Sequence, residues 1–180
     1  MTIPAIKLRR VYCFDTSAFV MLSRTSENII ELPKELWAHL EKMMREGEII
    51  SHEIVFAEIN SGTKDPDFIT KWVADKKDSF LKKTHNQVVE VSKIVKQFPG
   101  LIDSDAEHEQ ADPWIIALAI EKCKDRTLFQ DCECIVVSQE SQKSSKKIPA
   151  VCSFFNIKHF SLKDFFTDIG LTTQTTLGKA

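Results

Sequence analysis

Long apolar runs are missing from this 180-residue chain, and no stretch approaches the roughly 18 consecutive apolar residues of a membrane-spanning helix. At the N-terminus a short apolar segment precedes the basic residues, the reverse of the order in a signal peptide. We therefore expect a cytoplasmic protein without a membrane segment. The length, with 43% hydrophobic and 28% charged positions, predicts one domain over 1–171 and a flexible polar tail over 172–180.

Cysteine pairs with metal-binding spacing are missing as well. The chain has five cysteines, an odd number, and none of them forms a CxxC motif. Cys132 and Cys134 are the only close pair, and no histidine pair stands near them to complete a tetrahedral zinc site. We expect reduced thiols rather than disulfides or zinc ligands.

A glycine-rich phosphate loop is also absent, which argues against an enzyme that uses a nucleotide cofactor. The formal net charge of −2 argues against a protein that binds nucleic acid through bulk positive charge. That charge becomes +2, however, when four acids that could hold a metal ion are set aside. Weak, local binding of nucleic acid therefore remains open.

Short β-prone runs alternate with helical segments along the chain. Strands are predicted at 11–14, 49–51, 80–81, 134–137 and 158–160. Helices are predicted after Asp15, from Pro33 to a cap at Gly47, over 53–60 with an end at Gly62, from Asp65-Pro66 through Val73, over 88–98, from Asp112 through Cys123, from Pro149 and from Ser161. Parallel strands joined by helical crossovers predict a three-layer α/β/α sandwich.

Four carboxylates lie just after strands or near helix starts: Asp15, Glu58, Asp112 and Glu140. Open α/β sheets bind ligands beyond the carboxyl ends of their strands. Each acid has an alternative role, because Asp15 and Asp112 could cap helices, and Glu58 and Glu140 could be solvated surface charges. Together they predict a hard-oxygen site for Mg²⁺ or Mn²⁺, an ion that activates water and stabilises charge on a phosphoryl group. Without a cation, four neighbouring carboxylates would repel one another.

Polar and basic residues next to these acids are candidate supporting groups. Ser17 could bond a ligand or phosphate, or only cap a helix, and Ser138 could orient the site in the same way. Lys143, Lys146 and Lys147 could contact phosphates or form a solvated basic loop.

The three tryptophans are interpreted as core residues. Trp37, Trp72 and Trp114 lie within helical apolar patterns and are predicted to pack in the core rather than to stack on bases.

The acidic loop over 101–110 resembles a calcium loop only superficially. His108 stands where an EF-hand needs glycine, and Trp114 stands where it needs glutamate.

Four segments in this order resemble the motifs of PIN domains, the nuclease fold of VapC-like toxins. They are Val11-Tyr12-Cys13-Phe14-Asp15-Thr16-Ser17, Val55-Phe56-Ala57-Glu58-Ile59, Ala111-Asp112-Pro113-Trp114-Ile115-Ile116-Ala117-Leu118-Ala119 and Val136-Val137-Ser138-Gln139-Glu140. The resemblance covers about residues 10–170.

The resemblance implies a parallel, Rossmann-like sheet with strand order 3-2-1-4-5. It also implies that Asp15, Glu58 and Asp112 hold Mg²⁺ or Mn²⁺, with Glu140 completing the site. The expected activity is that of a metal-dependent endoribonuclease, the toxin half of a toxin–antitoxin pair. A homodimer and a protein antitoxin are expected partners.

Two departures from the family pattern leave alternatives open. Ser138-x-Glu140 stands where the family has Thr-x-Asp, and 146–152 resembles an uncharacterised PIN-like branch. The main alternative is a catalytically weak or inactive PIN-like module that binds RNA or protein. A phosphatase with an aspartate nucleophile is weaker, because Ser17 stands where that chemistry needs a second aspartate.

Overall fold

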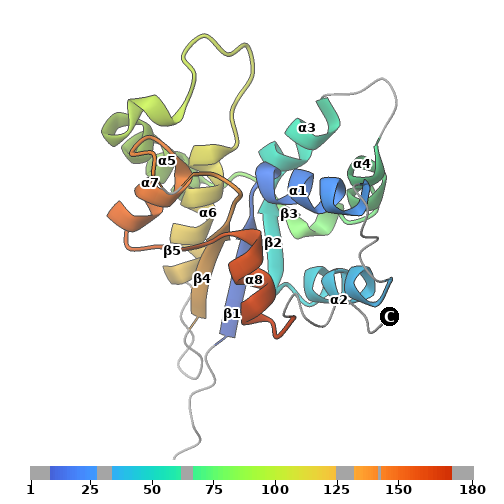
Figure 1. Ribbon diagram of the computed structural model, residues 1–180. Helices are drawn as coiled ribbons and strands as arrows, with labels where there is room; N and C mark the ends of the chain where they lie inside the picture. The colour runs from blue at the N-terminus through green and yellow to red at the C-terminus, as the bar shows by residue number, and fades with distance from the viewer. Residues whose placement is uncertain (1–8, 28–33, 62–66, 125–131, 142, 172–180) are drawn as a thin grey trace, which may run out of the picture.

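The structure, a computed structural model, describes residues 9–27, 34–61, 67–124, 132–141 and 143–171 (Figure 1). Within these ranges the strands are β1 (Arg9–Phe14), β2 (Ile49–His52), β3 (Phe80–Leu81), β4 (Cys132–Val137) and β5 (Lys158–Phe160). The helices are α1 (Thr16–Glu27), α2 (Lys34–Arg45), α3 (Glu53–Ser61), α4 (Phe68–Val73), α5 (His85–Gln97), α6 (Asp112–Lys124), α7 (Ile148–Phe154) and α8 (Leu162–Asp168). Short 3₁₀ turns are η1 (Lys77–Ser79) and η2 (Pro99–Leu101).

The strands form one parallel sheet in the order β3-β2-β1-β4-β5, which confirms the predicted strand order. β1 and β4 pair over their whole length, from Arg9 opposite Cys132 to Phe14 opposite Val137. This register makes the two strands end at the same level. The residues that follow them therefore emerge side by side at the carboxyl edge of the sheet.

Helices cover both faces of the sheet, as the three-layer prediction requires. Figure 1 shows α8 in front of the sheet and α6 behind it, and α6 contacts β1, β2 and β4. On the α8 side, the ring of Phe165 packs edge-on against Tyr12 and Phe14 of β1, with centroid distances of 4.9 Å. α5 packs against α6, away from the sheet.

α6 is buried along most of its length, since every residue from Pro113 to Ile120 lies in the core. A helix that is apolar on all sides must be enclosed on all sides, here by the sheet, α5 and α7. Its first residue, Asp112, is held at the carboxyl edge of the sheet by this packing. None of the described helices is long and apolar enough to cross a membrane.

Several helix starts and strand ends differ from the sequence prediction by one or two residues. β1 and β4 each begin two residues earlier than expected, and α7 begins at Ile148 instead of Pro149. α4 is capped by Asp67, whose carboxylate accepts a hydrogen bond from Thr70 N at 2.9 Å. The predicted cap at Gly47 is confirmed by its φ of +69°, a conformation that favours glycine.

Some predicted signals lie outside the described residues. These are Pro33, Gly62, Asp65-Pro66 and the tail over 172–180.

We expect Leu118→Ala to destabilise the fold by about 2–5 kcal/mol, because Leu118 is fully buried in α6 and its loss leaves a cavity. The melting temperature should fall by at least about 4 °C, as measured by thermal unfolding. Val88→Ala is the matched control, since Val88 on α5 is 49% exposed and its truncation should cost less than about 0.5 kcal/mol. Equal melting temperatures for the two variants would contradict the burial of α6.

Candidate functional site

Asp15 is fixed at the end of β1 by its own backbone. Its N–H donates to the carbonyl of Val137 at 3.0 Å, and its carbonyl accepts the Ala18 N–H at 3.1 Å as α1 begins. The Oδ2 atom accepts from Ser17 N at 3.0 Å and from Ser17 Oγ at 2.6 Å, so Asp15 caps α1 as one alternative predicted. The Oδ1 atom is buried and has no hydrogen-bond partner in the described part of the chain. One oxygen therefore caps the helix, while the other is buried without a hydrogen-bond partner among the described residues.

Asp112 lies inside the first turn of α6 rather than before it. The carbonyl of Ala111 accepts the N–H groups of Trp114 at 2.9 Å and Ile115 at 3.0 Å, so Ala111 takes the cap position. The alternative in which Asp112 caps the helix is therefore wrong. Its half-buried carboxylate is free for another role.

Burial and neighbouring negative charge disfavour the ionised forms of Asp15 and Asp112. Burial raises the pKa of Asp15 to about 6 against the hydrogen bonds from Ser17, and the charge of Glu58 adds to the rise. Burial also raises the pKa of Asp112 to about 8, and the charges of Asp15 and Glu140 raise it further. The predicted acids thus act on one another electrostatically, and a cation placed between them would relieve their repulsion.

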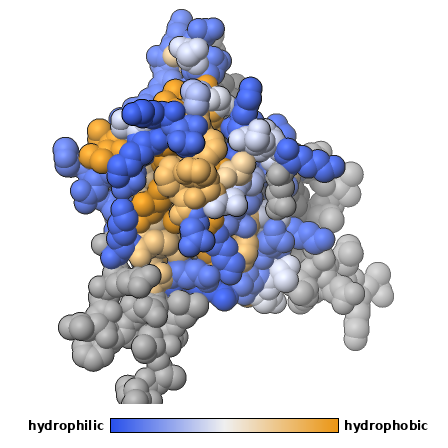
Figure 2. All heavy atoms as spheres, turned by 90° about the vertical axis from the view of Figure 1, so that its left-hand side faces the viewer, coloured by the Kyte–Doolittle hydropathy of each residue, from blue (hydrophilic) through white to orange (hydrophobic). Residues whose placement is uncertain are grey.

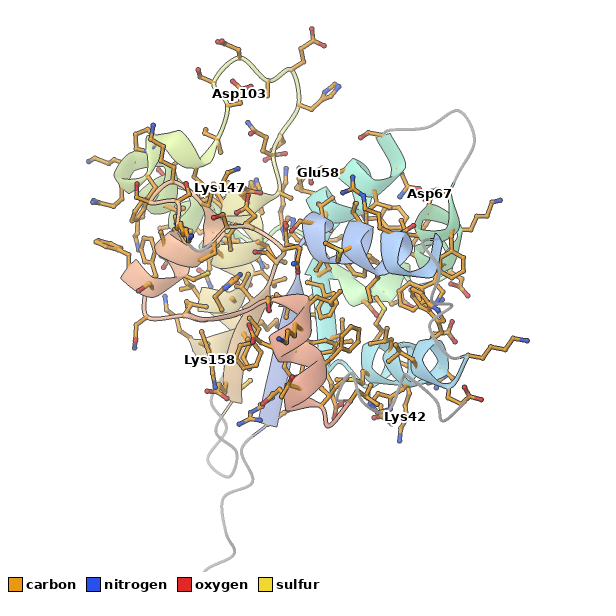
Figure 3. All side chains as sticks on the ribbon, viewed as in Figure 1. Lys42, Glu58, Asp67, Asp103, Lys147 and Lys158 are labelled. Carbon is orange, nitrogen blue, oxygen red and sulfur yellow. The ribbon has the colours of Figure 1, made fainter. Side chains whose placement is uncertain are left out.

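Glu58 connects the starts of two helices. From α3, its Oε1 accepts the Ala111 N–H at 2.8 Å, and its Oε2 accepts the hydroxyl of Thr16. Figure 3 shows Glu58 in the upper half of the view, beside the start of α1 and below the loop that carries Asp103. The solvated-surface alternative for Glu58 is therefore wrong, because both carboxylate oxygens hold neighbouring elements in place.

Glu140 is engaged in a similar way on the opposite side of the site. Its Oε2 accepts the Ile148 N–H at 2.8 Å at the start of α7, and its Oε1 pairs with Lys147 Nζ at 3.0 Å. The hydrogen bond from Lys147 to Glu140, together with the charges of Glu140, Asp112 and Asp15, raises the pKa of Lys147. The charge of Glu140 therefore acts on Asp112, but both of its carboxylate oxygens already have partners.

The supporting serines have different roles. Ser17 Oγ donates to Asp15 and accepts the Gln139 N–H at 2.9 Å, so it links the ends of β1 and β4. Ser138 is buried, and its Oγ lies 2.9 Å from His159 Nε2 on β5. Ser138 therefore contacts a histidine and not a carboxylate, contrary to its predicted role in orienting the site.

The three candidate lysines lie in different surroundings. Lys147 faces the carboxylates, and Lys143 is exposed. The side chain of Lys146 lies over Gly100 of η2, where a Cβ atom would come within 2.9 Å of Lys146 Cδ. Of the three, Lys147 is the one that the structure joins to the acidic cluster.

Sequence reasoning missed the groups that hold the acids in position. These are Thr16 and the backbone of Ala111, which bind Glu58. Thr16 could have been considered, since it follows Asp15 directly, but no side chain marks Ala111, whose contribution is a backbone N–H. Lys147 was a candidate phosphate contact, and only its pair with Glu140 was not foreseen.

The donor set fits a hard divalent cation held by a small number of protein oxygens. Within the described residues, no three His, Cys, Asp or Glu side chains converge closely enough to form a complete metal shell. Magnesium nevertheless often binds through one or two carboxylates, with water and substrate phosphate as its other ligands. The buried, unpartnered Oδ1 of Asp15 and the carboxylate of Asp112 suit that arrangement among the described residues, while Glu58 and Glu140 remain bound to their partners.

We predict that Asp112→Asn stabilises the metal-free protein at high pH. Because the pKa of Asp112 is about 8 in the folded chain and about 4 in an unfolded one, its contribution to stability is complete below pH 4 and is lost as the pH rises to 8. Thermal unfolding in chelator should give the variant a higher melting temperature at pH 8, by roughly 2–4 °C for each kcal/mol gained. The difference should vanish near pH 4. Parallel profiles would mean that Asp112 is not buried among like charges.

Comparisons with known proteins place the chain in one family. A comparison with curated proteins finds no match. Among solved structures, a similar one is VapBC2 from Rickettsia felis bound to a DNA fragment from its promoter, with 15% identity, a TM-score of 0.49, and coverage of 84% of this chain and 98% of that chain. The family model described as "Domain of unknown function (DUF4411)" matches residues 12–173, a range that contains all four carboxylates. The chain therefore belongs to the DUF4411 family.

Proposed function

We propose that this protein hydrolyses phosphodiester bonds in RNA with the help of Mg²⁺ or Mn²⁺. The observation that carries the proposal is the pair of Asp15 and Asp112 at the carboxyl edge of the sheet. Both have a raised pKa, and Asp15 has a buried oxygen without a hydrogen-bond partner among the described residues. Perturbed carboxylates that lack partners are typical of functional sites.

Asp15 and Asp112 would hold the ion, which when bound supplies an activated water and stabilises negative charge on the phosphoryl group. Glu58 sets the spacing of these two acids, because it bonds Thr16 next to Asp15 and Ala111 next to Asp112. Ser17 holds Oδ2 of Asp15 and would leave Oδ1 available to the ion. Lys147, held by Glu140, offers a positive charge to a phosphate oxygen.

Asp112→Asn should reduce metal-dependent RNA cleavage by at least roughly a hundredfold, because a metal ion supplies several kcal/mol of transition-state stabilisation and needs the carboxylate charge. Purified protein would be incubated with mixed cellular RNA in Mn²⁺ or in chelator, and the new RNA ends mapped. Asp78→Asn is the matched control. Because Asp78 is an exposed residue of η1, the variant protein should cleave RNA at the wild-type rate. Wild-type cleavage by a folded Asp112→Asn protein would remove Asp112 from the site.

Mn²⁺ should raise the melting temperature of the wild-type protein. Binding to the folded state alone adds about 2.7 kcal/mol at a hundredfold excess over Kd. Asp15→Asn should melt higher than wild type in chelator and respond less to Mn²⁺. Glu140→Gln should melt lower, since it weakens the pair with Lys147, but keep the Mn²⁺ response.

Thermal scans of these proteins with and without Mn²⁺ test the ligand assignment directly. Equal Mn²⁺ responses in wild type and Asp15→Asn would exclude Asp15 as a ligand. If Mn²⁺ no longer raised the melting temperature of Glu140→Gln, Glu140 would have to be counted as a metal ligand.

A non-catalytic module that binds RNA or protein is the second candidate. It is favoured by the hydrogen bonds that occupy Glu58 and Glu140, and by the lack of a complete metal shell among the described residues. Such a module would bind RNA without a Mn²⁺ response and without cleavage.

The biological role rests on the sequence resemblance alone. By that resemblance we propose the toxin half of a toxin–antitoxin pair, with a protein antitoxin, a homodimeric assembly and a cytoplasmic location. A small regulator encoded beside this gene would support the role, and co-purification of the two proteins would test it.

A further inference from the structure

Three phenylalanine rings form a cluster on the surface that carries α5 and α7. The Phe154 ring centroid lies 5.1 Å from that of Phe98 and 5.1 Å from that of Phe155, with nearly perpendicular planes. Phe98 and Phe155 are half-buried against the core, whereas Phe154 is 60% exposed. Figure 2 looks at this face and shows an apolar patch framed by hydrophilic residues. The cluster thus holds one ring rigidly in solvent.

Lysines connect this cluster with the carboxylates. Lys147 lies directly before α7 and pairs with Glu140, while Phe154 is the last residue of α7. The rise of a helix places the two ends of α7 about 10 Å apart. The side chain of Lys146 lies over Gly100, which follows Phe98 by two residues in the chain.

We propose that Phe154, supported by Phe98 and Phe155, is a stacking platform for a base of single-stranded nucleic acid whose phosphates contact Lys146 and Lys147. The choice of RNA as the ligand rests on the proposed function. Proteins that bind single strands combine basic grooves with aromatic rings, because every base has a face that can stack. A ring exposed near ammonium groups and close to an acidic metal site has that combination.

Charge and composition favour a nucleic acid over a protein or a membrane. Lysine is depleted in protein interfaces, whereas Lys143, Lys146 and Lys147 all precede α7 and are exposed. Membrane-surface helices present a long apolar face, but α7 has only seven residues, and Ile148, Val151 and Cys152 are buried. The exposed acidic loop 103–109 would repel a polyanion, so we expect the strand to pass over α7 instead.

Binding of a labelled, single-stranded oligouridylate, followed by fluorescence anisotropy in chelator, tests the platform without cleavage. All proteins in this assay carry Asp112→Asn to remove one repelling charge. Phe154→Leu should weaken binding roughly 5- to 100-fold, the range expected for loss of one stacked base. Phe154→Trp should retain binding. Phe68→Leu is the matched control, since Phe68 on α4 is also exposed, at 42%. This variant should bind the oligouridylate with unchanged affinity.

Two further comparisons separate stacking from charge. An abasic oligomer of the same length should bind with equal affinity to the proteins with and without Phe154→Leu. Lys146→Met should weaken the binding of both oligomers. It should also lower the slope of log Kd against log salt concentration by about 0.7, the value for one phosphate contact on a single strand.

Unchanged oligouridylate binding by folded Phe154→Leu would overturn the proposal. If that variant also changes from dimer to monomer in sedimentation, the patch is a protein interface instead. Failure of the nuclease proposal gives a different pattern, namely Phe154-dependent RNA binding by a wild-type protein that never cleaves.

Discussion

The pairing of β1 with β4 is the constraint on which the rest of the site depends. Six consecutive pairs in register bring Phe14 and Val137 to the same level, and the bond from Asp15 N to Val137 O extends the pairing by one step. A shift of one residue would turn Tyr12 and Phe14 away from Phe165 of α8 and would bury polar atoms on the other face. The position of Asp15 therefore follows from core packing rather than from any contact with a ligand.

Around Asp15, favourable hydrogen bonds and ion pairs offset the repulsion between carboxylates. Burial and like charge oppose ionisation of Asp15 and Asp112, whereas Ser17 and Lys147 favour it. The fold keeps these acids together because Glu58 and Glu140 form hydrogen bonds that would be lost if the elements moved apart. The stability of the fold is thus lowered locally wherever Asp15 and Asp112 are ionised, and the hydrogen bonds of the two glutamates offset that cost.

The fold could be predicted because local patterns and global packing agree. Alternation of apolar strands with helices is visible along the whole sequence, and even the two-residue strand β3 lies where it was expected. The placement of acids after strands also predicted which end of the sheet would carry the site. The hydrogen bonds could not be predicted, since Glu58 reaches partners 42 and 53 positions away. The tryptophans pack as predicted, with Trp114 in the core and Trp37 and Trp72 against it, but the sequence did not single out Phe154, the most exposed aromatic ring among the described residues.

The length of the two glutamate side chains has a consequence for how this family can vary. Glu58 spans the distance from α3 to the starts of both α1 and α6, and Glu140 reaches Lys147 and the first turn of α7. Aspartate carries the same charge but is one methylene shorter, so it would leave at least one of these partners without a bond. At position 58, where the partners are a hydroxyl and a backbone N–H, reach rather than charge is then the property that mutation must preserve, whereas position 140 needs both reach and the charge that pairs with Lys147. Relatives with aspartate at position 140 should have a correspondingly shorter connection between β4 and α7.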